Sequence, residues 1–300
     1  METIKKNNIL LWGDLCIDRN NLQGKEVCGP GGSVYYSSKI FKNFNWNPFI
    51  ISPRGKDYDD AWLGGVSIFP KTPFLDRTLV YQNRYDSNGK RTLYSENRDC
   101  ASFINPSLLP PELINSAKAI VVCPIDNNVS LLNIKELTKV MGKETLLTCL
   151  PQGFFRRYEE DGKVYQDEWE NAEEIIPYLD LIFLSEEDGK DLDKKAEEWN
   201  RLGVIVVITR AEKGCSVFKD GERTDFAAFS VEKVIDPVGS GDVFSAAFIH
   251  SYLLDKDFKK AAIFANATAA LSLSFHVQEI KIDIKRINNL ISKGQKKQLN

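Results

Sequence analysis

The sequence has few of the residues from which several kinds of functional site are built. Its 300 residues include two histidines, His250 and His276, and six cysteines without a CxxC pair, so no zinc-binding constellation is present. The formal net charge is -3 and no long basic stretch occurs, which argues against nucleic acid as a partner. No Gly-Lys pair precedes Ser or Thr, which excludes a Walker-type phosphate loop.

Long apolar runs are also missing. The N-terminal stretch METIKKNNILLWGD contains only four consecutive apolar residues, too few for a signal peptide or a membrane-spanning helix. We therefore expect a cytoplasmic protein with no membrane partner, whose cysteines are reduced. With 43% hydrophobic and 27% charged residues, the chain is long enough to bury one large core.

Short apolar runs alternate with helical patterns along most of the chain. Such runs are typical of strands buried on both faces, so we expect an α/β fold with three layers and a mostly parallel central sheet. The runs are NILLWG near residue 8, AIVVC near 119, TLLTCL near 145, DLIFL near 180 and VIVVIT near 204. The helical patterns begin at Ser130, at Ser185, near Asp242 and near Phe258.

Two segments break this alternation and predict a small β-sheet lid. RTLVYQNRY and KRTLYSENR flank DSNG, where Asn88-Gly89 tolerates the positive φ of a tight hairpin turn. NNLQGKEVC is similarly polar and extended, so the lid elements are expected near 19–28 and 77–96 of a single domain, 1–300. Apolar lid edges would allow a homodimer through the lid. Asp161-Gly162 and Asp220-Gly221 predict further surface hairpins or loops.

The segment DPVGSGDVFSAAF carries the most chemical information. Gly239 and Gly241 precede an apolar helix, so consecutive N–H groups can point into one anion-binding concavity at its N-terminus. Asp242 at the same turn could accept the proton of an attacking hydroxyl. The alternative is that these residues only cap the helix, since Gly, Ser and Asp are common in that role.

This segment resembles the C-terminal signature of the ribokinase-like (PfkB) carbohydrate kinase family, and CGPGGSVYYSS resembles its N-terminal Gly-Gly element. The opening strand with Gly13-Asp14, the Ser-Glu-Glu-Asp run after DLIFL, VITRAEKG and Asn266 follow in the family's order. The resemblance implies an ATP-dependent kinase that uses Mg²⁺, together with a monovalent cation such as K⁺. Its acceptor would be a hydroxyl group of a small polyol, sugar or nucleoside.

The same resemblance assigns roles to particular residues. Catalysis is implied for Asp242 as base, with the backbone of Gly239, Ser240 and Gly241 as anion hole. The residues implied to bind the acceptor are Asp14, Asp18, Gly31, Gly32, Arg156 and Asp242. Those implied to bind the nucleotide are Ser185, Asp188, Thr209, Gly214, Asn266 and Gly241. Asp188 would bind the metal through water and Asp236 the monovalent cation. Asp14 as a turn residue, Arg156 as an exposed loop charge and Asn266 as a buried helix polar group remain alternatives.

The sequence departs from the family's pattern at three places. Ser185-Glu-Glu-Asp188 replaces the usual Asn-x-x-Glu, which puts metal binding there in doubt. Ala211 replaces a glycine of the nucleotide loop, and Tyr36 replaces an asparagine that contacts the acceptor, which points away from ribose. LPQGFFRRYEEDGKVYQDEW, with Arg156, is similar to inositol kinases within the family. An inositol-like or sugar acceptor is therefore favoured. A nucleoside kinase, or a nucleotide-binding regulator that has lost efficient transfer, is the alternative.

Overall fold

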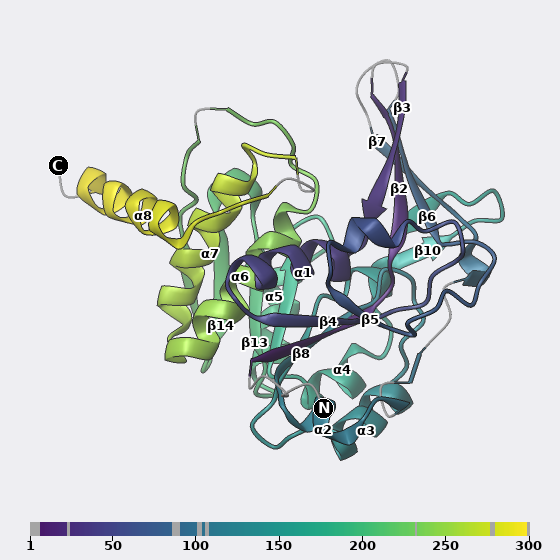
Figure 1. Ribbon diagram of the computed structural model, residues 1–300. Coiled ribbons are helices and arrows are strands. Elements are labelled where there is room, and N and C mark those ends of the chain that lie inside the picture. The colour runs from purple at the N-terminus through teal and green to yellow at the C-terminus, as the bar shows by residue number, and fades with distance from the viewer. Residues whose placement is uncertain are drawn as a thin grey trace.

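The computed structural model describes residues 7–22, 25–85, 91–100, 104–105, 108–231, 233–276 and 280–298. Its centre is a nine-stranded sheet in the order β15-β14-β13-β12-β9-β8-β1-β4-β5, flanked by helices (Figure 1). The strands of this sheet are β1 (Asn8–Gly13), β4 (Asn47–Ile51), β5 (Ser67–Phe69), β8 (Ala117–Cys123), β9 (Leu146–Cys149), β12 (Leu181–Ser185), β13 (Ile205–Thr209), β14 (Cys215–Lys219) and β15 (Glu222–Phe226). Neighbours from β5 to β13 run parallel, and β14 and β15 are antiparallel.

Helices cover both faces of the sheet and complete the expected three layers. They are α1 (Ser33–Asn43), α2 (Pro111–Asn115), α3 (Leu131–Val140), α4 (Ala172–Ile175), α5 (Leu192–Asn200), α6 (Ser240–Asp255), α7 (Phe258–Ser272) and α8 (Ile284–Gln298). Short 3-10 turns lie at Asp60–Leu63, Arg98–Cys100, Gln152–Phe155, Ile176–Tyr178 and Ala211–Lys213. In the part of the chain that the structure describes, none of the helices is long and apolar enough to cross a membrane.

The alternation of side chains along the central strands divides the core in two. Ile9 and Leu11 of β1 pack in the half that includes α1, α6 and α7, whereas Leu10 and Trp12 pack in the half that includes α3 and α5. Because both faces are covered, such a strand is apolar over most of its length, which explains the predictive value of the short apolar runs. All five predicted strands are confirmed as β1, β8, β9, β12 and β13.

The predicted helix from Ser185 is wrong at its start. Ser185 ends β12, and α5 begins only at Leu192. The Asp188 carboxylate accepts a hydrogen bond of 2.7 Å from the Ser185 backbone N–H, so the intervening residues form a turn and not a helix. The helix expected from Ser130 does form, and Ser130 and Asn133 make a reciprocal capping box at its start.

The lid is a second sheet in the order β3-β2-β6-β7, which stands out from the edge of the main body (Figure 1). Its strands are β2 (Cys16–Leu22), β3 (Lys25–Gly31), β6 (Val80–Tyr85) and β7 (Arg91–Glu96). The two hairpins join through a parallel pairing of β2 with β6. The Asn88-Gly89 turn lies outside the described residues. The homodimer through the lid stays a prediction.

A small hairpin of β10 (Arg156–Tyr158) and β11 (Val164–Gln166) lies against the lid, where the Ser95 N–H donates to the Gly162 carbonyl over 2.7 Å. This hairpin contains the predicted Asp161-Gly162 turn. The Asp220-Gly221 turn likewise joins β14 to β15.

Helix α6 is apolar all round because neighbours cover all its sides. An unbroken run of its residues from Val243 to His250 is buried, in contact with α1, α7 and the sheet. This packing fixes the helix, and so fixes the glycine-rich turn from which it starts.

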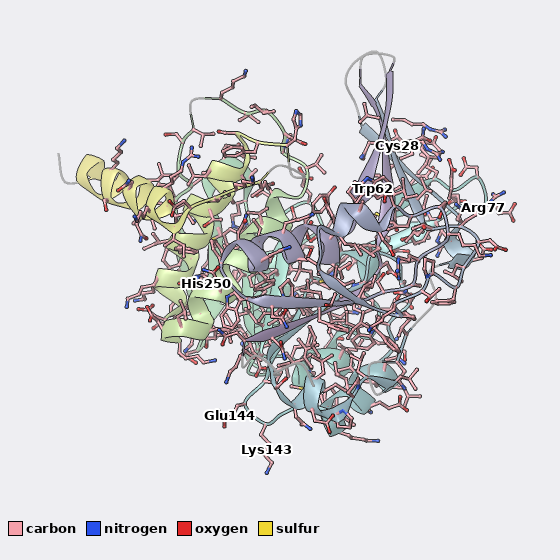
Figure 2. All side chains as sticks on the ribbon, in the orientation of Figure 1. Cys28, Trp62, Arg77, Lys143, Glu144 and His250 are labelled. Atoms are coloured by element: carbon pink, nitrogen blue, oxygen red, sulfur yellow. The ribbon has the colours of Figure 1, made fainter. Side chains whose placement is uncertain are left out.

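His250 is a buried ionisable residue within this helix (Figure 2). The side chain is 7% exposed, the Trp46 Nε1–H donates to its Nδ1 over 2.8 Å, and the Phe44 ring stacks on it at 4.4 Å between centroids. Burial lowers the pKa of the imidazole to about 4. The folded protein therefore holds His250 neutral and hydrogen-bonded.

We expect the stability contributed by neutral His250 to be complete above pH 6.5 and to be lost as the pH falls toward 4. In that window the unfolded chain, with the ordinary pKa of 6.5, binds a proton that the folded chain does not. Replacing His250 by Gln removes this dependence. The free-energy difference between wild type and His250→Gln should therefore shrink by about 2.5 kcal/mol from pH 7.5 to pH 4.5.

Urea titrations of both proteins at the two pH values measure this change. The buried carboxylates with raised pKa values act in the opposite direction in each protein, because they favour the folded state at low pH, and they cancel in the difference. An equal difference at pH 7.5 and pH 4.5 would show that His250 titrates normally in the folded state.

Candidate active site

The predicted site residues gather at the carboxyl edge of the parallel sheet. Of these, Asp14 follows β1, Ser185 ends β12 and Thr209 ends β13. Asp126, which was not predicted, follows β8 at the same edge. Parallel strands present their carboxyl ends at one edge, where α/β proteins usually bind their ligands. Strand β2 of the lid begins two residues after Asp14, so the lid continues from the same edge.

Asp242 lies in the first turn of α6, behind the glycine turn. Gly239 caps the helix with φ of 74°, a left-handed conformation that glycine adopts without strain. The first N–H groups of a helix have no partner one turn earlier, so this end of α6 can receive an anion. Ser240 makes part of the turn itself, because its N–H donates to the Pro237 carbonyl over 3.2 Å.

Burial raises the pKa of the Asp242 carboxyl to about 6, although its hydrogen bond with Ser33 opposes the rise. The neighbouring charge of Asp18 raises the pKa further and that of Arg156 lowers it. A carboxylate with a pKa just below neutrality is ionised at pH 7 and is still basic enough to take a proton. The first turns of α1 and α6 thus meet at this side chain.

Asp14 is 1% exposed and accepts hydrogen bonds from the loop that follows β8. Its Oδ1 accepts from the Asn128 amide over 2.8 Å, and its Oδ2 accepts from the Ile125 N–H over 3.3 Å. Burial raises the pKa of Asp14 to about 7, with the Asn128 contact acting against the rise. Asp14 therefore ties two strand ends together.

Asp18 projects from β2 of the lid toward the Gly-Gly turn. The Tyr36 hydroxyl donates to Asp18 Oδ2 over 2.6 Å, and the Cys16 thiol lies 3.3 Å from Oδ1. A Cβ atom at Gly31 would overlap this carboxylate. At Gly32, φ is 95° and a Cβ atom would overlap the Asp14 carbonyl. Gly31 is thus required for the close approach of the Asp18 side chain, and Gly32 for that of the backbone after β1.

Arg156 belongs to this cluster and is not an exposed loop charge. Its Nη1–H donates to the Ile125 carbonyl over 2.8 Å, and its guanidinium lies 4.9 Å from the centroid of the Tyr81 ring. Its positive charge lowers the pKa values of Asp242 and of Asp188. Arg156 therefore lies between the predicted acceptor side and the predicted donor side.

The structure adds several residues to the sequence-based prediction. Arg98 and Asp126 form a two-pronged ion pair of 2.8 and 2.9 Å, and Arg98 stacks on Tyr158 at 3.5 Å. Tyr81 and Tyr158 share a hydrogen bond of 2.8 Å. The polar run Asp126-Asn127-Asn128, shortly after the buried strand β8, could have indicated Asp126 from the sequence alone. The partners of Asp126 come from distant segments, and no local pattern identifies them.

Ser185 and Asp188, the residues implied to bind the nucleotide and the metal, lie in the turn that follows β12. Burial raises the pKa of Asp188 to about 6, and its bond from the Ser185 N–H opposes that rise. No group of three or more metal-ligating side chains occurs among the residues with described positions. A single carboxylate still fits Mg²⁺, which commonly enters with nucleotide phosphates and keeps several waters.

The nucleotide-loop residues are held mainly by the backbone. The Thr209 hydroxyl donates to the Leu184 carbonyl over 3.1 Å, and Gly214 has φ of 104°, where a Cβ atom would overlap the Phe226 carbonyl. The Asn266 amide donates to the carbonyls of Phe226 and Ala227 over 3.3 Å each. These contacts support Asn266 as a buried helix polar group that holds the end of β15. Its place in an adenine pocket stays a prediction.

Residues 78–278 match the pfkB family of carbohydrate kinases. The chain belongs to this family. A cytidine kinase of Thermococcus kodakarensis is 26% identical over 249 residues, which cover 76% of this chain and 82% of that protein.

Solved structures share the ribokinase-like fold of this pfkB-family chain. A ribokinase of Thermotoga maritima superposes with a TM-score of 0.73 at 19% identity, over 95% of this chain and 99% of that chain. A pyrophosphate-dependent kinase of the ribokinase family, solved with a pyrophosphate analogue and myo-inositol, superposes with a TM-score of 0.75 at 21% identity. This superposition covers 94% of this chain and 99% of that chain. The three-layer fold with a lid is thereby confirmed.

Ala211 marks a departure of this pfkB-family chain with a visible backbone consequence. Its φ is 46°, so an alanine occupies a left-handed conformation in the exposed 3-10 turn before Gly214. This conformation costs an L-residue about 1–2 kcal/mol, more than glycine's additional unfolded-state entropy of about 0.5–1 kcal/mol.

Ala211→Gly should therefore raise the free energy of unfolding by up to about 1 kcal/mol. Ala227→Gly is the matched control, since Ala227 is not among the positive-φ residues and glycine there should destabilise by a similar amount. Urea denaturation of the two variants gives the comparison. A loss of stability in Ala211→Gly would mean that residue 211 is not left-handed in solution.

Asp236 precedes the glycine turn of this kinase and is already engaged. Its Oδ1 accepts from the Val238 N–H over 3.0 Å, and its Oδ2 lies 3.4 Å from His276 Nδ1. A cation at Asp236 would share the carboxylate with this imidazole. The monovalent-cation site stays a prediction.

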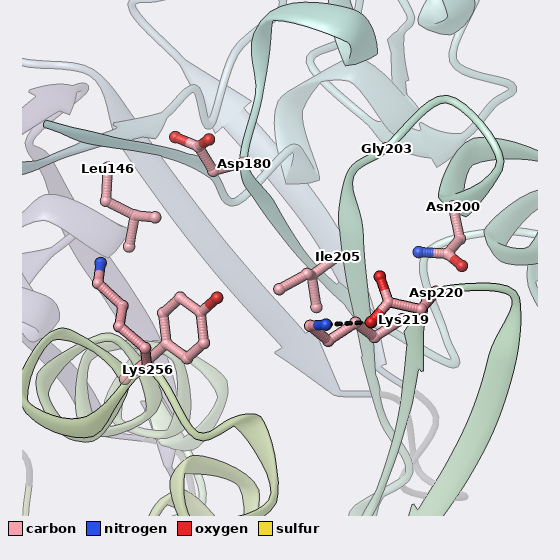
Figure 3. Close-up of a pocket in the computed structure, with 9 residues that line it drawn as sticks. Leu146, Asp180, Asn200, Gly203, Ile205, Lys219, Asp220 and Lys256 are labelled. Atoms are coloured by element: carbon pink, nitrogen blue, oxygen red, sulfur yellow. Dashed lines mark hydrogen bonds and ion pairs between the residues drawn. The ribbon is translucent and has the colours of Figure 1, made fainter. Parts of the chain in front are cut away.

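A hollow of about 330 Å³ lies at the opposite edge of the sheet (Figure 3). It is lined at the amino ends of the strands by Leu146, Asp180 and Ile205, and at the carboxyl end of α6 by Lys256. The remaining lining residues are Asn200, Gly203, Lys219, Asp220 and Tyr252. The hollow is thus separated from Asp242 by the length of α6 and does not belong to the candidate active site.

Proposed function

We propose that the protein is an ATP-dependent kinase that transfers the γ-phosphoryl group to a hydroxyl of a small polyhydroxylated compound, with a cyclic polyol or a sugar favoured. The observation that carries this proposal is the position of Asp242. Its carboxylate lies at a glycine-capped helix start, with a pKa raised to about 6, beside the acceptor-side residues Asp18 and Arg156.

In the proposed reaction, Asp242 accepts the proton of the acceptor hydroxyl as the oxygen attacks the γ-phosphorus. The bond from that phosphorus to the β,γ-bridging oxygen breaks, and ADP leaves with the electron pair. The N–H groups at the Gly239 turn stabilise the negative charge on the transferred phosphoryl oxygens. Arg156 adds a positive charge between the two substrates, because its guanidinium is already fixed by Ile125 and Tyr81.

Asp14 and Asp18 bind the acceptor in this proposal. Carboxylates suit vicinal hydroxyl groups, since each carboxylate oxygen can accept a hydrogen bond. Closure of the lid over the bound acceptor would exclude water, so that transfer goes to the hydroxyl and not to hydrolysis. Asp188 would hold Mg²⁺ through water, and the ion would neutralise phosphate charge.

The acceptor class is inferred from the family, from Tyr36 in place of an asparagine, and from the similarity of residues 150–169 to inositol kinases. The cytidine kinase among the relatives supports a nucleoside acceptor as the alternative. The pyrophosphate-dependent relative makes pyrophosphate the donor to compare with ATP.

An acceptor panel tests the proposal. Wild-type protein with Mg²⁺ is supplied with one donor, ATP or pyrophosphate, and with cyclic polyols, hexoses, pentoses or nucleosides as acceptors. Release of ADP from ATP, or of inorganic phosphate from pyrophosphate, is followed. We expect at least one polyol or sugar to stimulate ADP release well above the acceptor-free rate. A preference for nucleosides would select the alternative acceptor class.

The rival from another class is a nucleotide-binding regulator without efficient transfer. Thermal stabilisation by Mg-ATP is expected under both views, so binding alone does not separate them. Stabilisation by ATP with no product from any acceptor and donor would favour the regulator.

A further inference from the structure

Tyr36 connects the two halves of the proposed site. It lies in the first turn of α1, is 6% exposed, and its backbone N–H donates to the Gly32 carbonyl over 3.2 Å. Its hydroxyl donates to Asp18 Oδ2 over 2.6 Å, within the short range of a hydrogen bond to an ionised oxygen. The helix that follows the Gly-Gly turn thereby holds a side chain of the lid.

The Tyr36 ring lies against the glycine that starts α6. A Cβ atom at Gly239 would lie 2.9 Å from Tyr36 Cγ and 3.1 Å from each Cδ atom. Such distances are too short for a real Cβ contact, so the backbone of Gly239 packs directly on the ring. The φ of Gly239 is 74°, a left-handed conformation that the proposed anion hole requires. The Tyr36 ring packs against this residue and so supports that conformation.

Asp18 has restricted freedom on its other sides. The Cys16 thiol approaches its Oδ1 at 3.3 Å, and its carboxylate fills the space where a Gly31 side chain would be. Loss of the Tyr36 hydroxyl should therefore rotate the Asp18 carboxylate about its side-chain bonds and should not displace it from this position.

Tyr36 remains a hydrogen-bond donor throughout the range in which the protein would work. Burial and the adjacent negative charge of Asp18 raise the pKa of the phenol well above its ordinary value. Its hydroxyl therefore keeps its proton, and the bond to Asp18 is present whenever that carboxylate is ionised.

We propose that Tyr36 is a positioning residue with two separable actions: its hydroxyl orients the Asp18 carboxylate toward the acceptor, and its ring supports Gly239 at the phosphoryl-binding turn. This inference rests on the proposed kinase function. It goes further by assigning acceptor affinity to the hydroxyl and transfer rate to the ring.

Tyr36→Phe and Tyr36→Leu separate the two actions. Tyr36→Phe keeps the ring, so we expect the acceptor KM to rise about tenfold while kcat and the ATP KM stay within about twofold of wild type. Tyr36→Leu also removes the ring, so kcat should fall about tenfold in addition. Thermal denaturation of each variant confirms folding. Tyr35→Phe, the adjacent buried tyrosine, is the control and should leave the acceptor KM unchanged.

A double-mutant cycle shows whether the hydroxyl acts through Asp18. In an Asp18→Ala background, Tyr36→Phe should have no further effect on the acceptor KM, because the hydrogen-bond partner is gone. A tenfold additional rise in that background would overturn the inference, as would an unchanged acceptor KM in Tyr36→Phe alone. If the wild type is inactive, the proposed function is contradicted, and the inference with it. If the wild type is active but the variants give either of the two overturning results, only the role of Tyr36 is contradicted.

Discussion

Replacing Asp242 by Asn should lower kcat by about 10²- to 10⁴-fold without unfolding the protein, because it removes the base and keeps the shape. The amide oxygen can still accept the hydrogen bond from Ser33. Burial raises the pKa of Asp242 to about 6, so the carboxylate is costly to hold in place and a neutral amide is not. We therefore expect the melting temperature of Asp242→Asn to equal or exceed that of wild type at pH 7.5.

Steady-state kinetics with the best acceptor of the panel, together with thermal denaturation, gives both quantities. Asp255→Asn is the control, since Asp255 ends the same helix at the far side of the molecule and pairs with Lys260 at the surface. It should leave kcat unchanged. Turnover by Asp242→Asn within tenfold of wild type would show that another group takes the proton.

Replacing Asp14 by Asn should lower kcat/KM for the acceptor about 100-fold and leave the ATP KM within about twofold. At pH 8.5 the Asp14 carboxyl, with a pKa of about 7, is ionised. Hydrogen bonds to a charged group contribute about 1 to 2 kcal/mol more than neutral ones, and two acceptor hydroxyls would lose this difference. The fold should survive, because the Asn128 amide can turn over and offer its oxygen to the newly introduced amide group, while the Ile125 N–H still meets an oxygen.

Asp180→Asn is the matched control for this experiment. Asp180 is an exposed carboxylate that, like Asp14, accepts a hydrogen bond from a backbone N–H, that of Leu147 over 2.7 Å, but it lines the hollow at the opposite edge of the sheet. Its replacement should not change the acceptor KM. If Asp14→Asn and Asp180→Asn affect the acceptor equally, the loss comes from general destabilisation and Asp14 does not bind the acceptor.

The central sheet could be predicted because its physical requirement is local. A strand covered on both faces is apolar over most of its length, and such runs are visible in the sequence. The lid hairpin was likewise visible, since alternating residues flank a turn sequence. The parallel pairing of β2 with β6 was not, because it joins segments about 60 residues apart with no pattern of their own.

The candidate site was only partly predictable for the same reason. Residues in the turns at Gly31 and Gly239 follow recognisable glycine patterns, and the structure brings them within contact through Tyr36. Tyr36 was visible in the sequence only as a departure from a family pattern. Its bond to Asp18 depends on how the lid strand crosses α1, which local sequence does not specify.

The helix expected from Ser185 shows how a local signal can mislead. Acidic residues after a strand favour a helix N-terminus, but Asp188 turns back and bonds to the Ser185 backbone. The same bond directs the carboxylate back toward the carboxyl end of β12. Local propensity was overridden at a position where the proposed function needs an acidic group.

The central claim is that the γ-phosphoryl group moves from ATP to an acceptor hydroxyl with Asp242 as base. The most direct test uses ATP labelled in the γ-phosphoryl group, with wild type and Asp242→Asn, and separates labelled acceptor from labelled inorganic phosphate. We expect the label in the acceptor with wild type and almost none there with the variant. Label that appears only as inorganic phosphate, or equally in the acceptor with both proteins, would contradict the account.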